Sequence, residues 1–135
     1  AANRGENLTV IFINNAVYGM TGGQMAPTTL LGQKTATTPR GRQADLEGYP
    51  LKIAEMLAQL PAVKYVERVS LDSPQEIIKT KKAVKQAFQN QIDNVGFSLV
   101  EILSPCPTYW EMPPQKALAW IRNSMIKEFP LGRIK

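Results

Sequence analysis

Leu8-Thr9-Val10-Ile11-Phe12-Ile13 is followed directly by Asn14-Asn15-Ala16-Val17-Tyr18-Gly19-Met20-Thr21-Gly22-Gly23-Gln24. The first of these runs is apolar and rich in branched side chains, which is typical of a strand buried on both faces of a parallel sheet. The second run is rich in Gly and in amide and hydroxyl side chains. In open α/β folds, ligands bind beyond the carboxyl ends of the strands. The two runs together predict an α/β fold with a ligand site at residues 14–24.

The side chains of this segment suit a hard cation and a phosphate group. The amide oxygen of Asn is a type of ligand that Mg²⁺ accepts. Glycines let backbone N–H groups approach phosphate oxygens closely, and Thr21 adds a hydroxyl donor. Taken alone, the Asn pair favours an ordinary turn after a strand.

The segment from Asn14 to Gln24 resembles the second half of the thiamine diphosphate motif of 2-oxoacid:ferredoxin oxidoreductases. The likeness continues through Ala26-Pro27-Thr28-Thr29 and Thr37-Thr38-Pro39, and returns between Phe97 and Thr108. It covers nearly the whole chain and indicates the β, cofactor-binding subunit of the 2-oxoisovalerate or 2-oxoglutarate type. The resemblance implies a three-layer thiamine diphosphate-binding fold. Residues 1–135 would be the C-terminal part of one such domain, with a partial parallel sheet flanked by helices.

The resemblance also assigns roles to residues of the turn. Asn15 would bind Mg²⁺ through its side chain and Val17 through its backbone carbonyl. The residues expected to line the thiamine diphosphate are Tyr18, Gly19, Met20 and Thr21, although core filling is an equal alternative for Met20. In the family, a Gly-Asp-Gly segment before the Asn pair supplies a further Mg²⁺ ligand. Residues 1–13 contain no Asp, so we expect that segment to have been cut away or to lie on another chain.

Cys106, in Ser104-Pro105-Cys106-Pro107, stands where the family has the fourth ligand of a [4Fe–4S] cluster. The flanking prolines would hold its thiolate rigidly, which suits cluster ligation. Because the chain has one Cys, the resemblance implies an ancestral ligand and not a cluster held by this chain alone. The alternative is a buried or reactive free thiol.

The composition excludes several classes of site. One Cys rules out an internal disulfide and indicates a reducing, cytoplasmic compartment. The absence of His removes the commonest general base, the Ser-His and Cys-His nucleophiles, and His-ligated zinc. No apolar run approaches the roughly 20 residues of a membrane helix.

The net charge is +5, and the densest basic cluster is Lys79, Lys81, Lys82 and Lys85. This cluster is either a solvated helix face or a docking site for an acidic protein such as ferredoxin. It has no interleaved aromatic residues and no accompanying nucleic-acid-binding motif, which argues against a nucleic-acid partner.

After the first strand, the pattern predicts alternating helices and strands, and therefore a parallel sheet of three strands. Residues 14–50 form one long loop rich in Gly, Thr and Pro. The buried side of the central helix is predicted at Ile77, Val84, Phe88 and Ile92. The expected elements are a helix at 50–60, a strand at 64–69, a helix at 74–94 capped by Ser73, a strand at 97–103 and a helix at 114–129.

Two further pairs of residues leave alternatives open. Arg40 and Arg42, in the long loop, would face a substrate carboxylate, a partner subunit or solvent. Tyr109 and Trp110 are interpreted as packing residues, with stacking as the alternative.

The implied reaction is oxidative decarboxylation of a 2-oxoacid to an acyl-coenzyme A, with electrons passed to ferredoxin. In such an enzyme this chain would supply the Mg²⁺-diphosphate end of the site, and no Glu of the chain is nominated as catalytic. A partner would supply the rest, so we expect sister subunits or a homo-oligomer. The alternative is a non-catalytic remnant of the fold that serves as a structural or interaction module.

Overall fold

The protein, described here by a computed structural model of residues 1–135, is built around a four-stranded sheet with the order β1-β5-β4-β6. The strands β1 (Thr9–Asn14), β5 (Phe97–Leu103) and β4 (Val63–Ser70) run parallel to one another. The short strand β6 (Gly132–Arg133) pairs antiparallel with β4. The sequence predicted the three parallel strands but not β6, which is too short to leave a pattern.

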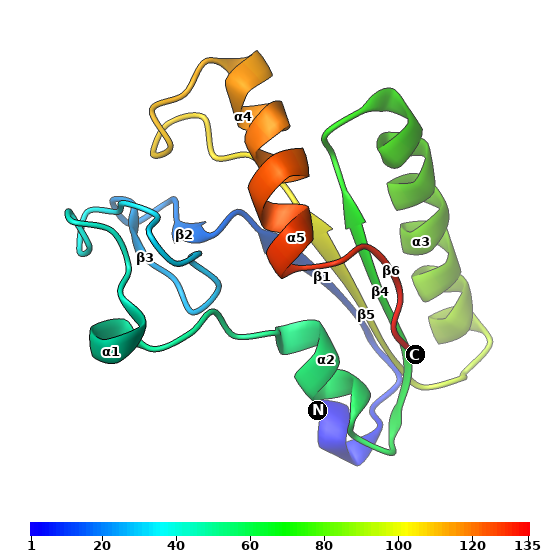
Figure 1. The fold of residues 1–135 in the computed structure, drawn as a ribbon. Coiled ribbons are helices and arrows are strands. Elements are labelled where there is room, and N and C mark those ends of the chain that lie inside the picture. Colours follow the sequence, from blue (N-terminus) through cyan, green and yellow to red (C-terminus); the bar gives the residue numbers. More distant parts are fainter.

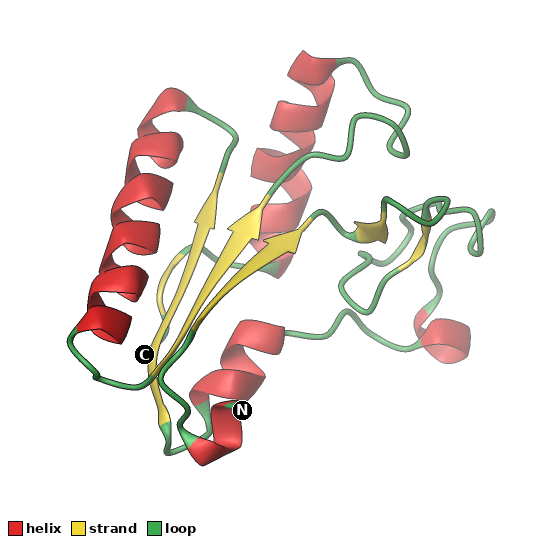
Figure 2. Ribbon diagram, turned by 180° about the vertical axis from the view of Figure 1, so that it is seen from behind, coloured by secondary structure: helices red, strands yellow, loops and turns green.

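Helices cover both faces of the sheet and make three layers (Figures 1 and 2). The helix α3 (Pro74–Ile92) lies on one face, where Ala83 and Ala87 pack with Tyr65, Val100 and Ile102. The opposite face carries α2 (Ile53–Ala58) and a C-terminal helical segment. That segment consists of α4 (Pro114–Trp120), the π-helical turn η2 (Ile121–Met125) and α5 (Ile126–Glu128).

The helix boundaries largely follow the predicted caps. Ser73 accepts a hydrogen bond from the Glu76 amide at 3.3 Å, and Pro74 occupies the first turn of α3. The predicted helix at 50–60 is shorter, because Pro50 lies outside it and α2 begins at Ile53. Along the C-terminal helical segment and at its end, Ile121, Met125 and Phe129 are fully buried, whereas Leu118 is only partly buried.

The prediction that the first strand is buried on both faces was wrong. β1 is the edge strand of the sheet, and most of its side chains are only half-buried. Ile13 is 50% exposed. A parallel sheet normally has its strands covered on both sides, so an open edge of this composition is available for another strand or chain.

The predicted buried face of the central helix was also wrong. The residues of α3 that contact the sheet are small, namely Thr80, Ala83 and Ala87. Small side chains let the helix lie close to the sheet. Phe88 is 49% exposed and Ile92 is 77% exposed, so an apolar stripe of α3 faces outward and only Val84 is partly buried as expected.

The long segment between β1 and α2 forms a lobe beside the sheet (Figure 1). It contains a small antiparallel pair, β2 (Val17–Tyr18) with β3 (Gln24–Met25), and a single helical turn, α1 (Ala44–Glu47). A 3-10 turn, η1 (Ala2–Arg4), precedes β1. No helix of the protein combines the length and the apolar character needed to cross a lipid bilayer.

Candidate functional site

The predicted ligand-binding turn begins where β1 ends. Asn14 is buried, and its Oδ1 accepts a hydrogen bond from the Ala16 amide at 3.1 Å. Ala16 has φ of 56°, a conformation that residues with a Cβ adopt uncommonly. The chain therefore bends sharply between the strand and β2, and this bend brings Asn15 and Val17 to the end of the sheet.

The bend is held from both sides. The Ala16 carbonyl accepts hydrogen bonds from Thr29 Oγ1 at 2.6 Å and from Gln33 Nε2 at 3.3 Å. The Asn15 carbonyl accepts one from Trp110 Nε1 at 3.0 Å. Two distant segments, residues 29–33 and Trp110, thus fix two successive peptide groups of the turn.

The backbone N–H groups at the tip of the turn, unlike the peptide groups of the bend, are mostly without partners. The backbone N–H groups of Gly19, Met20, Thr21 and Gly22 donate to no acceptor within the protein, whereas the Gly23 amide donates to the Tyr18 carbonyl at 2.9 Å. Met20 is fully exposed. Core filling, one of the two interpretations of Met20, is therefore wrong for this chain.

The Thr21 hydroxyl is engaged within the turn. It donates to Gln24 Oε1 at 2.8 Å, and Gln24 Nε2 donates to the Thr21 carbonyl at the same distance. This pair of bonds closes the β2–β3 turn. To contact a phosphate, the hydroxyl would have to leave Gln24, so the free backbone amides are the readier donors.

The structure brings together two sites that the sequence treated separately. A Cβ built on Gly19 would lie 3.2 Å from Cys106 Sγ and 3.3 Å from Asn15 Nδ2. Cys106 therefore packs against the turn that carries the predicted Mg²⁺ ligands. It is buried in an apolar cluster that includes Ala16, Val17 and Trp110. A lone thiol in such surroundings does not fit a four-iron cluster, which needs four ligands.

The donor set for a metal ion is incomplete within this chain. No group of three or more His, Cys, Asp or Glu side chains is placed to hold an ion. Asn15 Oδ1 lies 3.4 Å from the Val17 amide, a long contact that leaves the oxygen available to a cation. The arrangement fits a diphosphate at the turn, with any Mg²⁺ needing further oxygen ligands.

A cavity lies on the Gly22–Gly23 side of the turn. Its volume is about 860 Å³, and its walls include Leu30, Gln33, Tyr109, Trp110 and Trp120. Neither Asn15 nor Val17 lines it. Trp110 and Trp120 meet edge to face with centroids 4.5 Å apart, so Trp110 is a packing residue as expected and also a hydrogen-bond donor to the turn.

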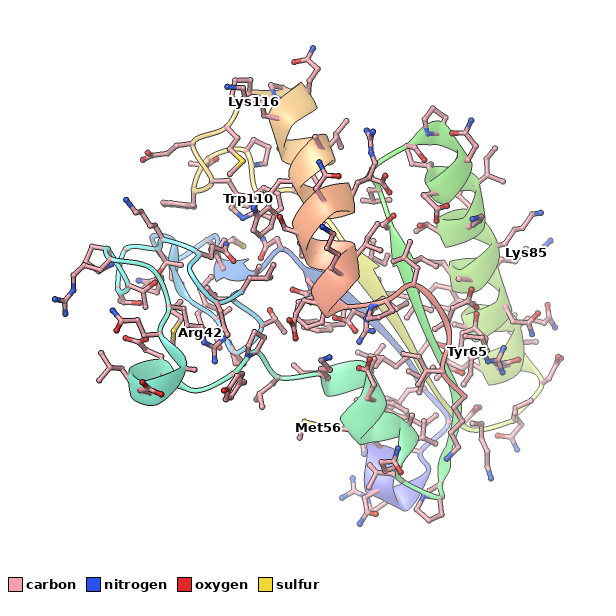
Figure 3. The ribbon with its side chains drawn as sticks, viewed as in Figure 1. Arg42, Met56, Tyr65, Lys85, Trp110 and Lys116 are labelled. Carbon is pink, nitrogen blue, oxygen red and sulfur yellow. The ribbon has the colours of Figure 1, made fainter.

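Arg42 has a structural role in the lobe, which differs from all three alternatives considered for it, namely a substrate carboxylate, a partner subunit and solvent. All five of its N–H donors point to backbone carbonyls, and the side chain is buried within the lobe (Figure 3). Burial lowers the pKa of Arg42, an effect that the nearby Glu47 partly offsets. Arg40 is exposed. The carbonyls that accept from Arg42 belong to Pro27, Thr29, Glu47, Gly48 and Tyr49, at 2.6–3.1 Å.

The lysine cluster lies on the solvent side of α3. Lys79, Lys81, Lys82 and Lys85 are all exposed, and Lys85 points away from the sheet (Figure 3). Lys79 forms an ion pair with Glu76 at 2.7 Å. This placement is compatible with both interpretations of the cluster.

Sequence reasoning missed the buried ionic side chains next to the turn. Arg68 and Glu101 have no exposed side-chain surface, and their Nε and Oε2 atoms are 2.8 Å apart. Burial alone would lower the pKa of Arg68, but Glu55 and Glu101 outweigh it and raise the pKa. For Glu101 the signal was present in the sequence, because it is the one charged residue of the mostly apolar strand β5.

Comparison with known proteins decides the family. Residues 1–102 match the model of the thiamine pyrophosphate enzyme, C-terminal TPP binding domain. The chain belongs to this family of thiamine pyrophosphate enzymes. It is 51% identical, over all 135 residues, to ketoisovalerate oxidoreductase subunit VorA of Methanothermobacter marburgensis, and spans 28% of that relative. It is 39% identical over 124 residues, 92% of the chain, to 2-oxoglutarate synthase subunit KorB of Archaeoglobus fulgidus, and spans 42% of it.

A solved structure supports the fold of this thiamine pyrophosphate enzyme domain. It is the 2-oxoglutarate:ferredoxin oxidoreductase from Magnetococcus marinus with 2-oxoglutarate, coenzyme A and succinyl-CoA bound. The TM-score is 0.62 at 27% identity, and the match covers 80% of this chain and 33% of the other. The parallel sheet between helical layers is thus the expected thiamine diphosphate-binding architecture.

Proposed function

We propose that this chain is the diphosphate-binding part of the thiamine diphosphate subunit of a 2-oxoacid:ferredoxin oxidoreductase. The observation that carries the proposal is the run of unpartnered backbone amides from Gly19 to Gly22, directly beside Asn15. Because the chain spans 28% of its VorA relative, the activity of the whole protein is part of this proposal. Residues 1–135 would form the C-terminal part of one domain.

In the proposed site, the turn binds the cofactor through its diphosphate. The free N–H groups of Gly19 to Gly22 would donate to phosphate oxygens, and Tyr18 would lie beside them. Asn15 Oδ1 and the Val17 carbonyl would bind Mg²⁺ together with ligands from outside this chain. When bound, thiamine diphosphate supplies the electron sink for decarboxylation. The residues of this chain orient the cofactor, and none of them transfers a proton.

The proposed substrate is a branched 2-oxoacid, because VorA, at 51% the more similar of the two relatives given above, is named for ketoisovalerate. Coenzyme A would accept the acyl group and ferredoxin the electrons. Iron–sulfur clusters would belong to other segments or subunits, since Cys106 is a lone, buried thiol. The lysines of α3 are the proposed contact for ferredoxin, and the proposed location is the cytoplasm.

Sister subunits or a second copy of the chain are the proposed partners. The open edge of β1 and the outward apolar stripe of α3 are surfaces that another polypeptide would cover. Neither surface has the interleaved aromatic and basic residues expected for nucleic acid.

The test is a titration of the whole gene product, with its co-purifying subunits, against thiamine diphosphate and Mg²⁺. Calorimetry should give saturable binding that Asn15→Ala weakens by about 10- to 100-fold, the usual effect of losing a metal-site group. Asn123→Ala, which removes an exposed amide outside the turn, is the matched control. Release of CO₂ from 3-methyl-2-oxobutanoate and from 2-oxoglutarate would then compare the two substrates.

The second candidate is a non-catalytic interaction module, and one observation favours it: no group of three or more His, Cys, Asp or Glu side chains of this chain is placed to hold an ion. If the whole gene product with its subunits fails to bind the cofactor, the module is the better account.

A further inference from the structure

A continuous chain of buried polar contacts runs across the sheet beneath the turn. It begins at Glu55 on α2, whose carboxylate receives two hydrogen bonds from the Arg68 guanidinium, at 2.8 and 2.5 Å. Arg68 Nε then donates to Glu101 Oε2 at 2.8 Å, and Asn14 Nδ2 donates to Glu101 Oε1 at 2.7 Å. The chain ends where Asn14 Oδ1 accepts from the Ala16 amide.

Folding stability alone does not account for these residues. Removing an Arg and a Glu from water costs several kcal/mol per ion, and apolar residues of similar volume often serve as well or better. The residues that flank Glu101 on β5 are apolar, and Leu99, Leu103 and Val66 on the two strands are fully buried. The network is nevertheless complete, because no buried side-chain nitrogen or oxygen lacks a partner.

The network fixes the orientation of one amide. A carboxylate can only accept hydrogen bonds, and Arg68 can only donate them. Glu101 divides its two oxygens between Arg68 and Asn14, so the nitrogen of Asn14 must face Glu101. The oxygen of Asn14 is then directed at the Ala16 amide, which holds Ala16 in its left-handed conformation.

We propose that Glu101 is a positioning residue for the metal-binding turn. Acting through Asn14, it sets the bend at Ala16 and thereby the positions of Asn15 and Val17 at the end of the sheet. Arg68 is the buried ion-pair partner that holds one oxygen of Glu101 inside the sheet. The inference rests on the proposed function, because it assigns a task to a turn whose ligand is thiamine diphosphate with Mg²⁺.

The test uses Glu101→Gln in the whole gene product with its subunits. Gln offers one oxygen, which must face Arg68, so its amide nitrogen faces Asn14. Asn14 then has to turn over and present its own nitrogen to the Ala16 amide. We expect the affinity for Mg²⁺, measured at saturating thiamine diphosphate, to fall roughly 10- to 100-fold. Trp110 is a built-in fluorescent reporter, since its indole donates to the Asn15 carbonyl.

Two further variants separate positioning from a general loss of stability. Glu55→Gln also removes a carboxylate from Arg68 but does not touch Asn14. It should lower the thermal midpoint while leaving the Mg²⁺ affinity close to that of the unmodified protein. The double variant Asn14→Asp with Glu101→Gln exchanges acceptor and donor between the two positions. It restores the hydrogen bonds from residue 101 through residue 14 to the Ala16 amide, so most of the lost Mg²⁺ affinity should return. Asn14→Asp alone places two carboxylates together, so it should not restore the affinity.

Three results would overturn the inference. They are an unchanged Mg²⁺ affinity in Glu101→Gln, an equal loss in Glu55→Gln, or no recovery in the double variant. Failure of the unmodified protein to bind thiamine diphosphate would instead refute the proposed function, and the positioning role with it.

Discussion

Two neighbouring regions of this protein handle their polar groups in opposite ways. Beneath the turn, Arg68, Glu101 and Asn14 are buried and every polar atom has a partner. At the tip of the turn, a few residues away, the amides from Gly19 to Gly22 have none. We call the buried network of Arg68, Glu101 and Asn14 the base of the turn. It costs free energy to assemble but hardly moves, and it supports a tip whose backbone donors are left free. Pre-organised donors of this kind are what anion binding requires.

The largest effect is expected from removing the charge at the centre of the base. Arg68→Met leaves Glu101 buried without its counter-ion, and breaking a buried pair in this way costs about 3–5 kcal/mol. Thermal unfolding of the whole gene product should show a strongly lowered midpoint. Lys79→Met, which breaks an exposed pair with Glu76, should cost no more than about 1 kcal/mol. Equal shifts of the thermal midpoint in the two variants would mean that solvent screens the Arg68–Glu101 pair as it screens a surface ion pair.

Arg42 provides the same comparison within the lobe. Arg42→Met strips hydrogen bonds from five backbone carbonyls, each worth about 1.5–3 kcal/mol when the donor is charged, though not additively. We expect residues 27–49 to lose protection from hydrogen exchange while β4 and β5 keep theirs. Arg40→Met is the matched control, because Arg40 is exposed, and its exchange pattern should match the unmodified protein. A change in substrate KM with unaltered exchange would restore the carboxylate-binding role for Arg42.

The contribution of this hydrogen-bonded network to protein stability should also depend on pH, through Glu55 at its exposed end. The hydrogen bond from Arg68 lowers the pKa of Glu55 below its ordinary value of 4.5. A lowered carboxyl pKa stabilises the fold above the unfolded-state pKa, and this contribution is lost as pH falls through the folded-state pKa. The thermal midpoint should therefore hold above about pH 4.5 and decline below it. Glu55→Gln should make the fall of the thermal midpoint with pH shallower, and Asp45→Asn should not. An unchanged slope in Glu55→Gln would mean that other carboxyl groups cause the decline.

The comparison also shows what could be predicted from the sequence. The strands Val63–Ser70 and Phe97–Leu103 and the cap at Ser73 were predictable because apolar runs and capping residues act locally. The orientation of α3 was not. Its apolar residues at helical spacing predicted the buried side, yet Ala83 and Ala87 contact the sheet and Phe88 faces outward. Close packing of the helix on the sheet favoured small residues over apolar ones.

In the candidate site, too, local features could be predicted from the sequence and long-range contacts could not. The turn itself was predictable from Asn14 to Gln24, because its residue types and its place after a strand point to one chemistry. Its supports were not, since Glu101 and Trp110 lie about 85–95 positions away and act only once the chain has folded. A charged residue inside an apolar strand was the available sign for Glu101.

The smallest effect is expected at the tip. Met20 is fully exposed and contacts no core residue, so Met20→Ala should change stability by no more than about 0.5 kcal/mol. Its remaining interpretation is contact with bound thiamine diphosphate. In that case the affinity for the cofactor should fall modestly, while the affinity for Mg²⁺ at saturating cofactor stays the same, because the Asn15 side of the turn is untouched. Ile92→Ala, an exposed apolar residue on α3, should alter neither affinity. If Met20→Ala lowers stability as Arg68→Met does, the tip is packed against something in the whole protein, and the contrast between a bonded base and a free tip no longer holds.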